Sequence, residues 1–166
     1  SLSVSPDGRQ LISCSQDGTV GLWRMPDDLM TIGLADPCIG YLSVSEQPLN
    51  WIAFSPDGRR FAVADGNSTI SIWSTSNKQK QFSLSGHHYW VACVAFSRDG
   101  QRMASGSYDS TIRIWKNLSQ STSSKRPGHK DKIQNIAVHD GSSRVATSSN
   151  DYTVRVWDAE SGQIGR

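Results

Sequence analysis

Residues Ser85–Trp115 read SGHHYWVACVAFSRDGQRMASGSYDSTIRIW, and the rest of the chain repeats their arrangement. The stretch opens with Gly86-His87, continues through an apolar run and an Asp-Gly turn, and ends at Trp115. The same order of features returns before and after it, with some members missing. A chain with such a period is built from similar structural units, so the period predicts the fold.

Four tryptophans mark the repeat. The alternating runs TVGLW, TISIW, TIRIW and TVRVW end at Trp23, Trp73, Trp115 and Trp157. These tryptophans are 50, 42 and 42 residues apart, and an Asp-Gly turn precedes each run. Strict alternation of apolar and polar residues predicts strands, and a period of roughly 40–45 residues is typical of a unit of four strands.

The Gly-His, Asp-Gly and Trp positions together make the chain resemble the WD-repeat family of β-propellers, over almost its whole length. The resemblance implies an all-β fold of about four four-stranded antiparallel units, each of them a propeller blade. We expect a single domain of residues 1–166, with units at approximately 1–44, 45–84, 85–126 and 127–166.

Runs of β-branched and aromatic residues between Pro, Asp and Gly turns predict the individual strands. We expect them at Leu2–Ser5, Gln10–Ser15, Thr19–Arg24, Ile39–Val44, Leu49–Phe54, Arg60–Ala64, Thr69–Ser74, Gln79–Leu84, Trp90–Phe96, Gln101–Gly106, Thr111–Lys116, Lys132–Val138, Arg144–Ser148 and Thr153–Asp158. Two segments depart from the period. Residues 25–40 form either a surface loop or a partner-binding hairpin, and the polar residues 117–125 form either a loose edge strand or a loop.

Closure of the ring is a separate question. A propeller closes when strands from both termini pair within one blade, which removes exposed sheet edges. The first unit has no His before Leu2, and the last has only the beginning of an outer strand, so we expect an incomplete ring or half-ring. Three arrangements remain open: a fragment of a longer protein, a homodimer that completes an eight-bladed ring, and a complete four-bladed ring.

Composition narrows the class of protein. The chain has 166 residues, of which 36% are hydrophobic, and a net charge of +2. No apolar run is long enough to span a bilayer, and no signal-peptide pattern opens the chain. Cys14, Cys38 and Cys93 lack the spacing of a disulfide framework, which favours a reducing compartment. We expect an intracellular protein, cytoplasmic rather than nuclear, with no membrane partner.

A His, a hydroxyl residue, an Asp and a Trp recur at fixed places in the units. They are His87, Ser105, Asp109 and Trp115 in the third unit, His129, Thr147, Asp151 and Trp157 in the fourth, and Ser13, Asp17 and Trp23 in the first. His, hydroxyl and carboxylate also suit a hydrolase, but an active site is assembled once, whereas this set recurs with its Trp. The resemblance implies a structural hydrogen-bond network instead, and we expect no catalytic residue.

The second unit departs from this pattern. It keeps Trp73, but Ser45, Val63 and Asn67 stand at the other three positions. We therefore expect the network to be absent there and the unit to depend more on apolar packing.

No cofactor or metal site is expected, because His87-His88 and the three distant cysteines lack the clustered spacing of metal ligands. The most basic stretch, residues 125–132, is expected to form the loop that enters the fourth unit. It is interpreted as a solvated loop or as a contact for an acidic protein patch, and a nucleic-acid partner is the least favoured reading because no aromatic residue accompanies the charges.

The resemblance also implies a rigid platform on which protein partners dock. Candidate contacts lie in the loops before the first strands and in the turns between the second and third strands: Tyr89, Trp90, Ser107, Tyr108, Lys130, Asn150, Tyr152 and Gln16. Packing of Trp90 and Tyr108 against neighbouring blades is the alternative. The function that we expect is a non-catalytic protein-interaction scaffold within a larger signalling or assembly protein. The alternatives are an enzyme framed by a propeller, or nucleic-acid binding through residues 125–132.

Overall fold

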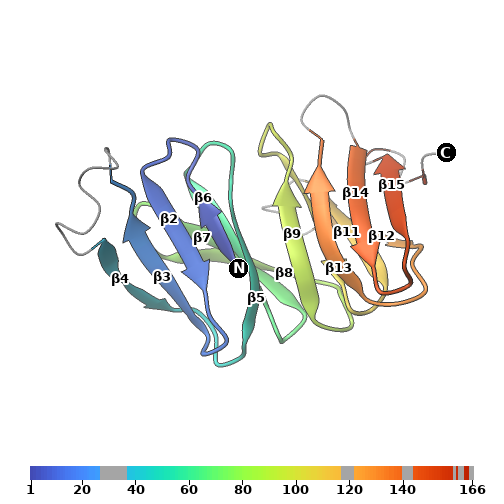
Figure 1. The fold of residues 1–166 in the computed structure, drawn as a ribbon, viewed down its shortest axis with the longest axis horizontal. Helices are drawn as coiled ribbons and strands as arrows, with labels where there is room; N and C mark the ends of the chain where they lie inside the picture. Colours follow the sequence, from blue (N-terminus) through green and yellow to red (C-terminus); the bar gives the residue numbers. More distant parts are fainter. Residues whose placement is uncertain (27–36, 117–121, 140–143, 159, 161–162, 165–166) are drawn as a thin grey trace.

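The computed structural model describes residues 1–26, 37–116, 122–139, 144–158, 160 and 163–164, with only the backbone for 122–127. In these residues four antiparallel sheets contain the strands β1 (Leu2–Val4), β2 (Gln10–Cys14), β3 (Thr19–Arg24), β4 (Cys38–Ser43), β5 (Leu49–Phe54), β6 (Arg60–Asp65), β7 (Thr69–Ser74), β8 (Lys80–Ser85), β9 (Val91–Phe96), β10 (Arg102–Ser107), β11 (Thr111–Lys116), β12 (Thr122–Pro127), β13 (Ile133–Val138), β14 (Arg144–Ser149) and β15 (Val154–Asp158) (Figure 1). The described residues contain no helix that could cross a membrane.

Each sheet is a meander in which consecutive strands are neighbours. The first three sheets have four strands each, and the last contains β13, β14 and β15. In the second sheet, the turn between β5 and β6 is fixed by its own polar residues. The Ser55 hydroxyl donates to Asp57 Oδ1 (2.6 Å), and the Arg60 backbone N–H donates to Ser55 Oγ (3.0 Å). The all-β fold with four antiparallel units is thereby confirmed.

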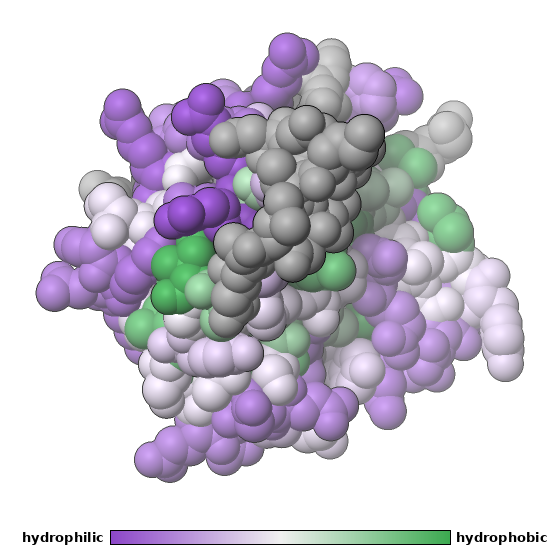
Figure 2. All heavy atoms as spheres, turned by 60° about the vertical axis from the view of Figure 1, so that its left-hand side comes forward, coloured by the Kyte–Doolittle hydropathy of each residue, from purple (hydrophilic) through white to green (hydrophobic). Residues whose placement is uncertain are grey.

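The core lies between neighbouring sheets, which pack face to face. At each of the three junctions a cluster of buried side chains joins strands of one sheet to strands of the next. Phe61 and Trp73, for example, pack against Ile12 and Val20 of the preceding sheet. The first and last sheets lie toward opposite sides of the molecule and do not pair, so the arrangement is open (Figure 1). The face turned forward in Figure 2 is largely hydrophilic, with smaller hydrophobic patches.

The strand boundaries fall within one residue of those predicted, with one exception. The fourth strand of the third sheet was expected within residues 117–125, but β12 spans Thr122–Pro127 and pairs along its length with β11. Residues 125–127 therefore belong to a strand, and the expectation that residues 125–132 form one basic loop is wrong. Pairing of an outer strand depends on backbone hydrogen bonds, which polar residues make equally well. Residues 117–121, and residues 27–36 of the 25–40 departure, lie outside the described residues.

Candidate functional site

The polar residues of the third repeat form one hydrogen-bonded chain. The Trp115 indole N–H donates to Ser105 Oγ (2.8 Å), and His87 Nε2 lies 2.8 Å from the same oxygen. His87 Nδ1 lies 3.0 Å from Asp109 Oδ2. Ser105 and Trp115 lie on the two middle strands, β10 and β11, while His87 precedes β9 and Asp109 lies in the turn after β10. The chain therefore ties an outer loop to the middle of the sheet.

The fourth repeat carries the same chain with threonine in place of serine. The Trp157 indole donates to Thr147 Oγ1 (2.8 Å), His129 Nε2 lies 2.8 Å from that oxygen, and His129 Nδ1 lies 3.0 Å from Asp151 Oδ2. Gly128 packs directly on the indole, because a Cβ atom at this position would lie 2.0 Å from Trp157 Cη2. This close approach accounts for the Gly of the Gly-His pair.

One direction of hydrogen bonding satisfies every member of these chains. An indole N–H can only donate and an ionised carboxylate can only accept. The hydroxyl therefore accepts from the indole and donates to His Nε2, and His Nδ1–H donates to the carboxylate. On this basis we assign the neutral Nδ1–H tautomer to His87 and His129.

The two carboxylates are held in their ionised form. Burial alone would raise the pKa of Asp109, but hydrogen bonds from His87 and Thr111 outweigh it and hold that pKa well below its ordinary value of 3.8. The pKa of Asp151 is lowered in the same way, since a hydrogen bond from Thr153 and further donors outweigh the effect of burial. Ionised carboxylates at both positions keep the chains polarised in one direction.

Burial and bonding favour a structural role for these residues over a catalytic one. Ser105 is 0% exposed and Thr147 is 1% exposed, and each hydroxyl already accepts an indole N–H. A nucleophilic hydroxyl needs an open approach for its substrate. These buried hydroxyls offer none, and the same set appears in two sheets.

The first repeat forms two separate parts of this hydrogen-bond network. The Trp23 indole donates to Ser13 Oγ (2.9 Å), and Asp17 Oδ1 accepts from the backbone N–H and the hydroxyl of Thr19 (2.9 and 2.7 Å). Gly21 lies across the strand pair from Ser13. A Cβ atom there would lie 2.8 Å from both Ser13 Oγ and Trp23 Nε1, so the glycine leaves room for this hydrogen bond.

In the second repeat, the hydroxyl that accepts the indole N–H lies on the neighbouring strand. Val63 stands at the hydroxyl position on β6, and its cross-strand partner on β7 is Ser71. The Trp73 indole donates to Ser71 Oγ (2.8 Å). The expectation that this unit lacks the network is therefore wrong for the indole. Ser71 and Trp73 are two residues apart on one strand and share a face, and this spacing was the sequence signal for the relocated bond.

The carboxylate of the second repeat also lies at a different sequence position from that of the other repeats. Asp65 lies two residues before Asn67, which stands at the Asp position, and it accepts the Thr69 hydroxyl (2.9 Å) and the Asn67 backbone N–H (2.9 Å). Ser45 Oγ, at the His position, lies 3.5 Å from Asp65 Oδ2. A shorter polar link thus joins the same loop, turn and strand, separately from the indole.

Three aromatic side chains stack in a row on the rim that carries His87 and Asp109. The rings of Tyr89 and Trp90 lie 6.0 Å apart with planes at 24°, and those of Trp90 and Tyr108 lie 6.1 Å apart at 28°. Tyr89 is 52% exposed and Trp90 is 43% exposed. Lys132, which the sequence analysis placed in the basic stretch 125–132 and not among the rim contacts, has its Nζ 5.0 Å from the centre of the Tyr108 ring. We call Tyr89, Trp90 and Tyr108 the aromatic rim stack.

The backbone beneath the aromatic rim stack is fixed by Ser107. Its hydroxyl lies 3.0 Å from the Tyr89 carbonyl and 2.9 Å from the Trp90 carbonyl, and the Tyr108 N–H donates to the Trp90 carbonyl (3.0 Å). Ser107 is 0% exposed, so its expected role as a rim contact is wrong. A buried hydroxyl needs partners inside the protein, and here these are the two carbonyl groups that position the rings.

The other predicted rim residues are exposed but do not join the stack. Tyr152 is fully exposed, in a left-handed backbone conformation with φ of 62°. Asn150 Oδ1 accepts from Gln134 Nε2 (3.1 Å), and the Lys130 N–H donates to the Asp151 carboxylate (2.9 Å). Gln16 occupies the corresponding turn of the first repeat. No group of three His, Cys, Asp or Glu side chains suited to a metal ion was found among the residues that the structure describes.

Comparison with known families agrees with this architecture. The family described as "WD domain, G-beta repeat" matches residues 1–24, 37–74, 78–116 and 120–158. These segments cover most of the chain and follow the four sheets closely. The chain belongs to this family of WD-repeat proteins.

Curated relatives match about half of the chain. This chain is 29% identical over 90 residues to "Protein LST8 homolog" of Drosophila melanogaster. That match covers 54% of this chain and 28% of the relative. The chain is 27% identical over 109 residues to "Ribosome biogenesis protein WDR12 homolog" of Drosophila persimilis, covering 56% and 25%. For "Non-functional target of rapamycin complex subunit LST8-2" of Arabidopsis thaliana, 91 residues are 28% identical, covering 55% and 29%. The matched part is less than a third of each relative.

Proposed function

We propose that the chain is a non-catalytic protein-interaction platform whose partner docks on the aromatic rim stack. The observation that carries this proposal is a row of three stacked rings, two of them about half exposed, on a backbone fixed by a buried serine. Large aromatic side chains are favoured anchors in interfaces because they bury much area and lose little rotamer entropy. The loop is already in place, so binding would cost little ordering.

The relatives support a role within an assembly. One of them is named as a complex subunit and another as a ribosome biogenesis protein. We infer that this chain likewise works by holding other proteins, and that its partner protein contacts the third and fourth repeats together, since Lys132 of the fourth borders the stack of the third.

The proposal is tested by comparing the proteins that co-purify with three variants of the tagged chain. Trp90→Ser removes the middle ring, Trp90→Phe keeps an aromatic ring there, and Tyr152→Ser removes a fully exposed tyrosine from the same rim outside the stack. We expect Trp90→Ser to lose at least about tenfold of the captured partner, because a central aromatic anchor is commonly worth 2 kcal/mol or more. Trp90→Phe and Tyr152→Ser should retain it.

Two controls make the outcome decisive. Thermal unfolding must show the same transition for all the variants, which is expected because Trp90 is partly exposed. Nuclease treatment of the extract must leave capture unchanged if the partner is a protein. Equal capture by Trp90→Ser and the unmodified chain would overturn the proposal, and loss of capture after nuclease treatment would favour a nucleic-acid partner instead.

A further inference from the structure

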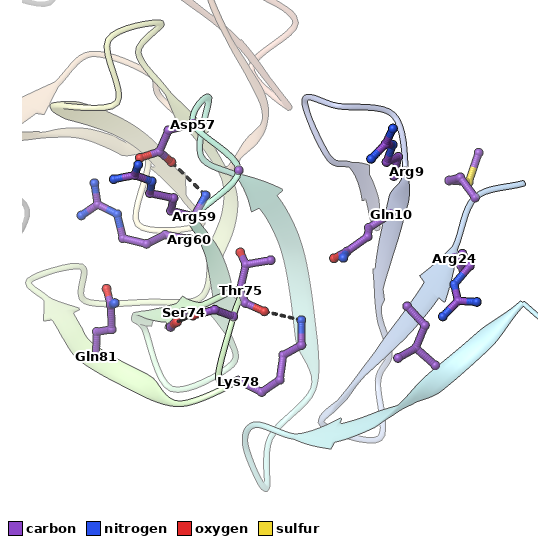
Figure 3. Close-up of a pocket in the computed structure, with 14 residues that line it drawn as sticks. Arg9, Gln10, Arg24, Asp57, Arg59, Arg60, Ser74, Thr75, Lys78 and Gln81 are labelled. Atoms are coloured by element: carbon purple, nitrogen blue, oxygen red, sulfur yellow. Dashed lines mark hydrogen bonds between the residues drawn. The ribbon is translucent and has the colours of Figure 1, made fainter. Parts of the chain in front are cut away.

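A cleft of about 1260 Å³ lies between the first and second sheets, at the ends of the strands opposite to the aromatic rim stack (Figure 3). Gln10 and Arg24 line it from the first sheet, and the turn after β7, which includes Thr75 and Lys78, lines it from the second. Ligand pockets typically enclose roughly 300–1,000 Å³. The cleft is therefore large enough for a peptide segment rather than only a small ion.

Positive charge is concentrated in this cleft. Its lining includes Arg9, Arg24, Arg59, Arg60 and Lys78, and the single carboxylate there among the described residues is that of Asp57. Asp57 already accepts hydrogen bonds from the Ser55 hydroxyl and the Arg59 backbone N–H. None of the four arginines forms an ion pair within the described part of the chain. On a chain with a net charge of only +2, this is a local excess of cations.

An ion pair lies at the equivalent place between the third and fourth sheets. There Arg102 Nη1 lies 2.7 Å from Glu160 Oε1, so an ion pair bridges the two sheets. The same sequence positions in the first and second repeats hold Gln10 and Ser76, and both line the cleft. The repeat thus has a position for a bridging carboxylate, and in the cleft that position carries none. Among the described residues, the five cations that line the cleft outnumber the nearby carboxylates of Asp57 and Asp7, and a ligand can neutralise the excess.

Two groups at the centre of the cleft are suited to an anion. Thr75 Oγ1 is buried and has no hydrogen-bond partner in the described structure. Lys78 donates from Nζ to the Thr75 carbonyl, which holds its charge at this place. Because buried hydroxyl groups are normally hydrogen-bonded, the Thr75 hydroxyl indicates a missing acceptor. A carboxylate or phosphate oxygen would be that acceptor.

One part of the lining is apolar. Met25 and Ile39 contribute to the first-sheet side of the cleft, and Ile39 is 49% exposed. A free inorganic anion or a nucleic-acid backbone would make no use of these side chains. A peptide can bring an apolar side chain to Met25 and Ile39 and acidic groups to the arginines, which pair well with carboxylate and phosphate oxygens.

We propose that the cleft between the first and second sheets binds an acidic segment of a protein partner that also carries an apolar side chain. The cations on the two walls neutralise its acidic groups, and Met25 and Ile39 receive the apolar side chain. This site is separate from the aromatic rim stack, so the two proposals stand or fall independently.

The test measures binding of a short fluorescent peptide, in which glutamates flank a central leucine, by anisotropy. Arg24→Gln/Arg59→Gln removes one cation from each wall. The matched control, Arg98→Gln/Arg144→Gln, removes two charges from exposed positions outside the cleft. We expect the cleft pair to raise Kd about tenfold or more, because charge-assisted hydrogen bonds are about twice as strong as neutral ones. The control pair should change Kd less than about twofold, because neither of its arginines lines the cleft.

Comparison ligands decide which part of the proposal holds. Replacing the leucine of the peptide with serine should weaken binding to the unmodified chain, and a single-stranded RNA of equal charge should bind more weakly than the leucine peptide. Trp90→Ser should bind the peptide as the unmodified chain does. Absence of peptide binding, equal weakening by the two arginine pairs, no effect of the leucine, or tighter binding of the RNA would each overturn the proposal.

Discussion

At the scale of single residues, the ionised carboxylate of Asp109 makes the stability of the fold depend on pH. Its pKa in the folded chain lies below the ordinary value of 3.8, so the folded state binds fewer protons than the unfolded chain as the pH falls through that value. Stability from this group is therefore fully present above the unfolded pKa and is lost on acidification. We expect the contribution of this carboxylate to the free energy of unfolding to be nearly constant from pH 7 to about pH 5 and to decrease below about pH 4.

The variant Asp109→Asn tests this assignment by urea unfolding at pH 7, 5 and 3. It should be less stable than the unmodified chain at pH 7 by about 1–3 kcal/mol, the usual range for hydrogen bonds to a charged group. The difference should shrink at pH 3, because protonation of this carboxyl group in the unfolded chain has by then removed part of its contribution to stability. Asp151 retains its lowered pKa in the variant and leaves part of the pH dependence. A difference that stays constant across the three pH values would contradict the assignment.

Cys93 provides a second prediction at this scale. Burial raises the pKa of its thiol to about 12, and its side chain is 0% exposed. Thiolates, not thiols, react with alkylating reagents, so Cys93 should be alkylated orders of magnitude more slowly than the partly exposed Cys38 in the native chain. Peptide mass spectrometry over a time course measures both rates. In denaturant the two should react alike, and equal rates in the native chain would show that the third and fourth sheets separate readily.

Residue roles differed in how far the sequence could predict them. The family resemblance implied the partners of the indoles and carboxylates, and the chemistry agrees, because a donor-only indole and an acceptor-only carboxylate have few options when buried. A serine hydroxyl donates and accepts in many geometries. The spacing of Ser71 and Trp73 allows the indole bond but does not single out this serine as the acceptor. The two carbonyl partners of Ser107 follow from a loop path that appears only in three dimensions.

At the scale of the strand, the two arrangements of the indole bond should differ in their contribution to stability. Ser105 connects Trp115 to His87, whereas Ser71 connects to Trp73 alone among the hydrogen bonds described. Trp115→Phe therefore removes a donor from a chain of buried groups, while Trp73→Phe removes one local bond. We expect Trp115→Phe to lower the free energy of unfolding by about 3 kcal/mol. The decrease for Trp73→Phe should be smaller than this by about 1–2 kcal/mol.

Urea unfolding midpoints of the two variants measure the difference. The slopes of the transitions should match that of the unmodified chain, so that midpoints report stability. Ser71→Ala serves as a companion variant, because it should cost no more than Trp73→Phe if the bond is local. An equal or larger loss in Trp73→Phe would show that its stacking on Phe61, with ring centres 6.4 Å apart, dominates the energetics of the second sheet.

Strand prediction succeeded where the sequence alternates between apolar and polar residues and failed where it does not. In β7 and β11 the isoleucines enter one junction between sheets and the tryptophan enters the other, and the alternation of the two sets is visible in the sequence. β12 reads TSSKRP, with no alternation, and forms because β11 offers it a free backbone edge. Its position depends on the partner strand, which a local pattern does not contain.

At the scale of the whole molecule, the end sheets expose residues that the inner junctions bury. Ile112 and Ile114 of β11 are 0% and 2% exposed against the fourth sheet, whereas their equivalents in β15, Val154 and Val156, are 71% and 39% exposed. On the first sheet Leu2 is 64% exposed. The two end faces thus resemble the two halves of an inner junction.

The chain of 166 residues, expressed alone, should therefore associate end to end through these faces. Light scattering across a concentration series should give a mass above the 18.2 kDa of one chain. A plateau at twice that mass would indicate two copies closing an eight-bladed ring, whereas a mass that rises continually would indicate open head-to-tail assembly.

Val154→Lys/Val156→Lys should return the chain to the monomer, because charges on the face oppose burial. The control Ser43→Lys/Asn77→Lys, at exposed polar positions, should not. A monomer at every concentration would show that the exposed valines are tolerated in water and that the inner junctions owe their stability to connection along the chain.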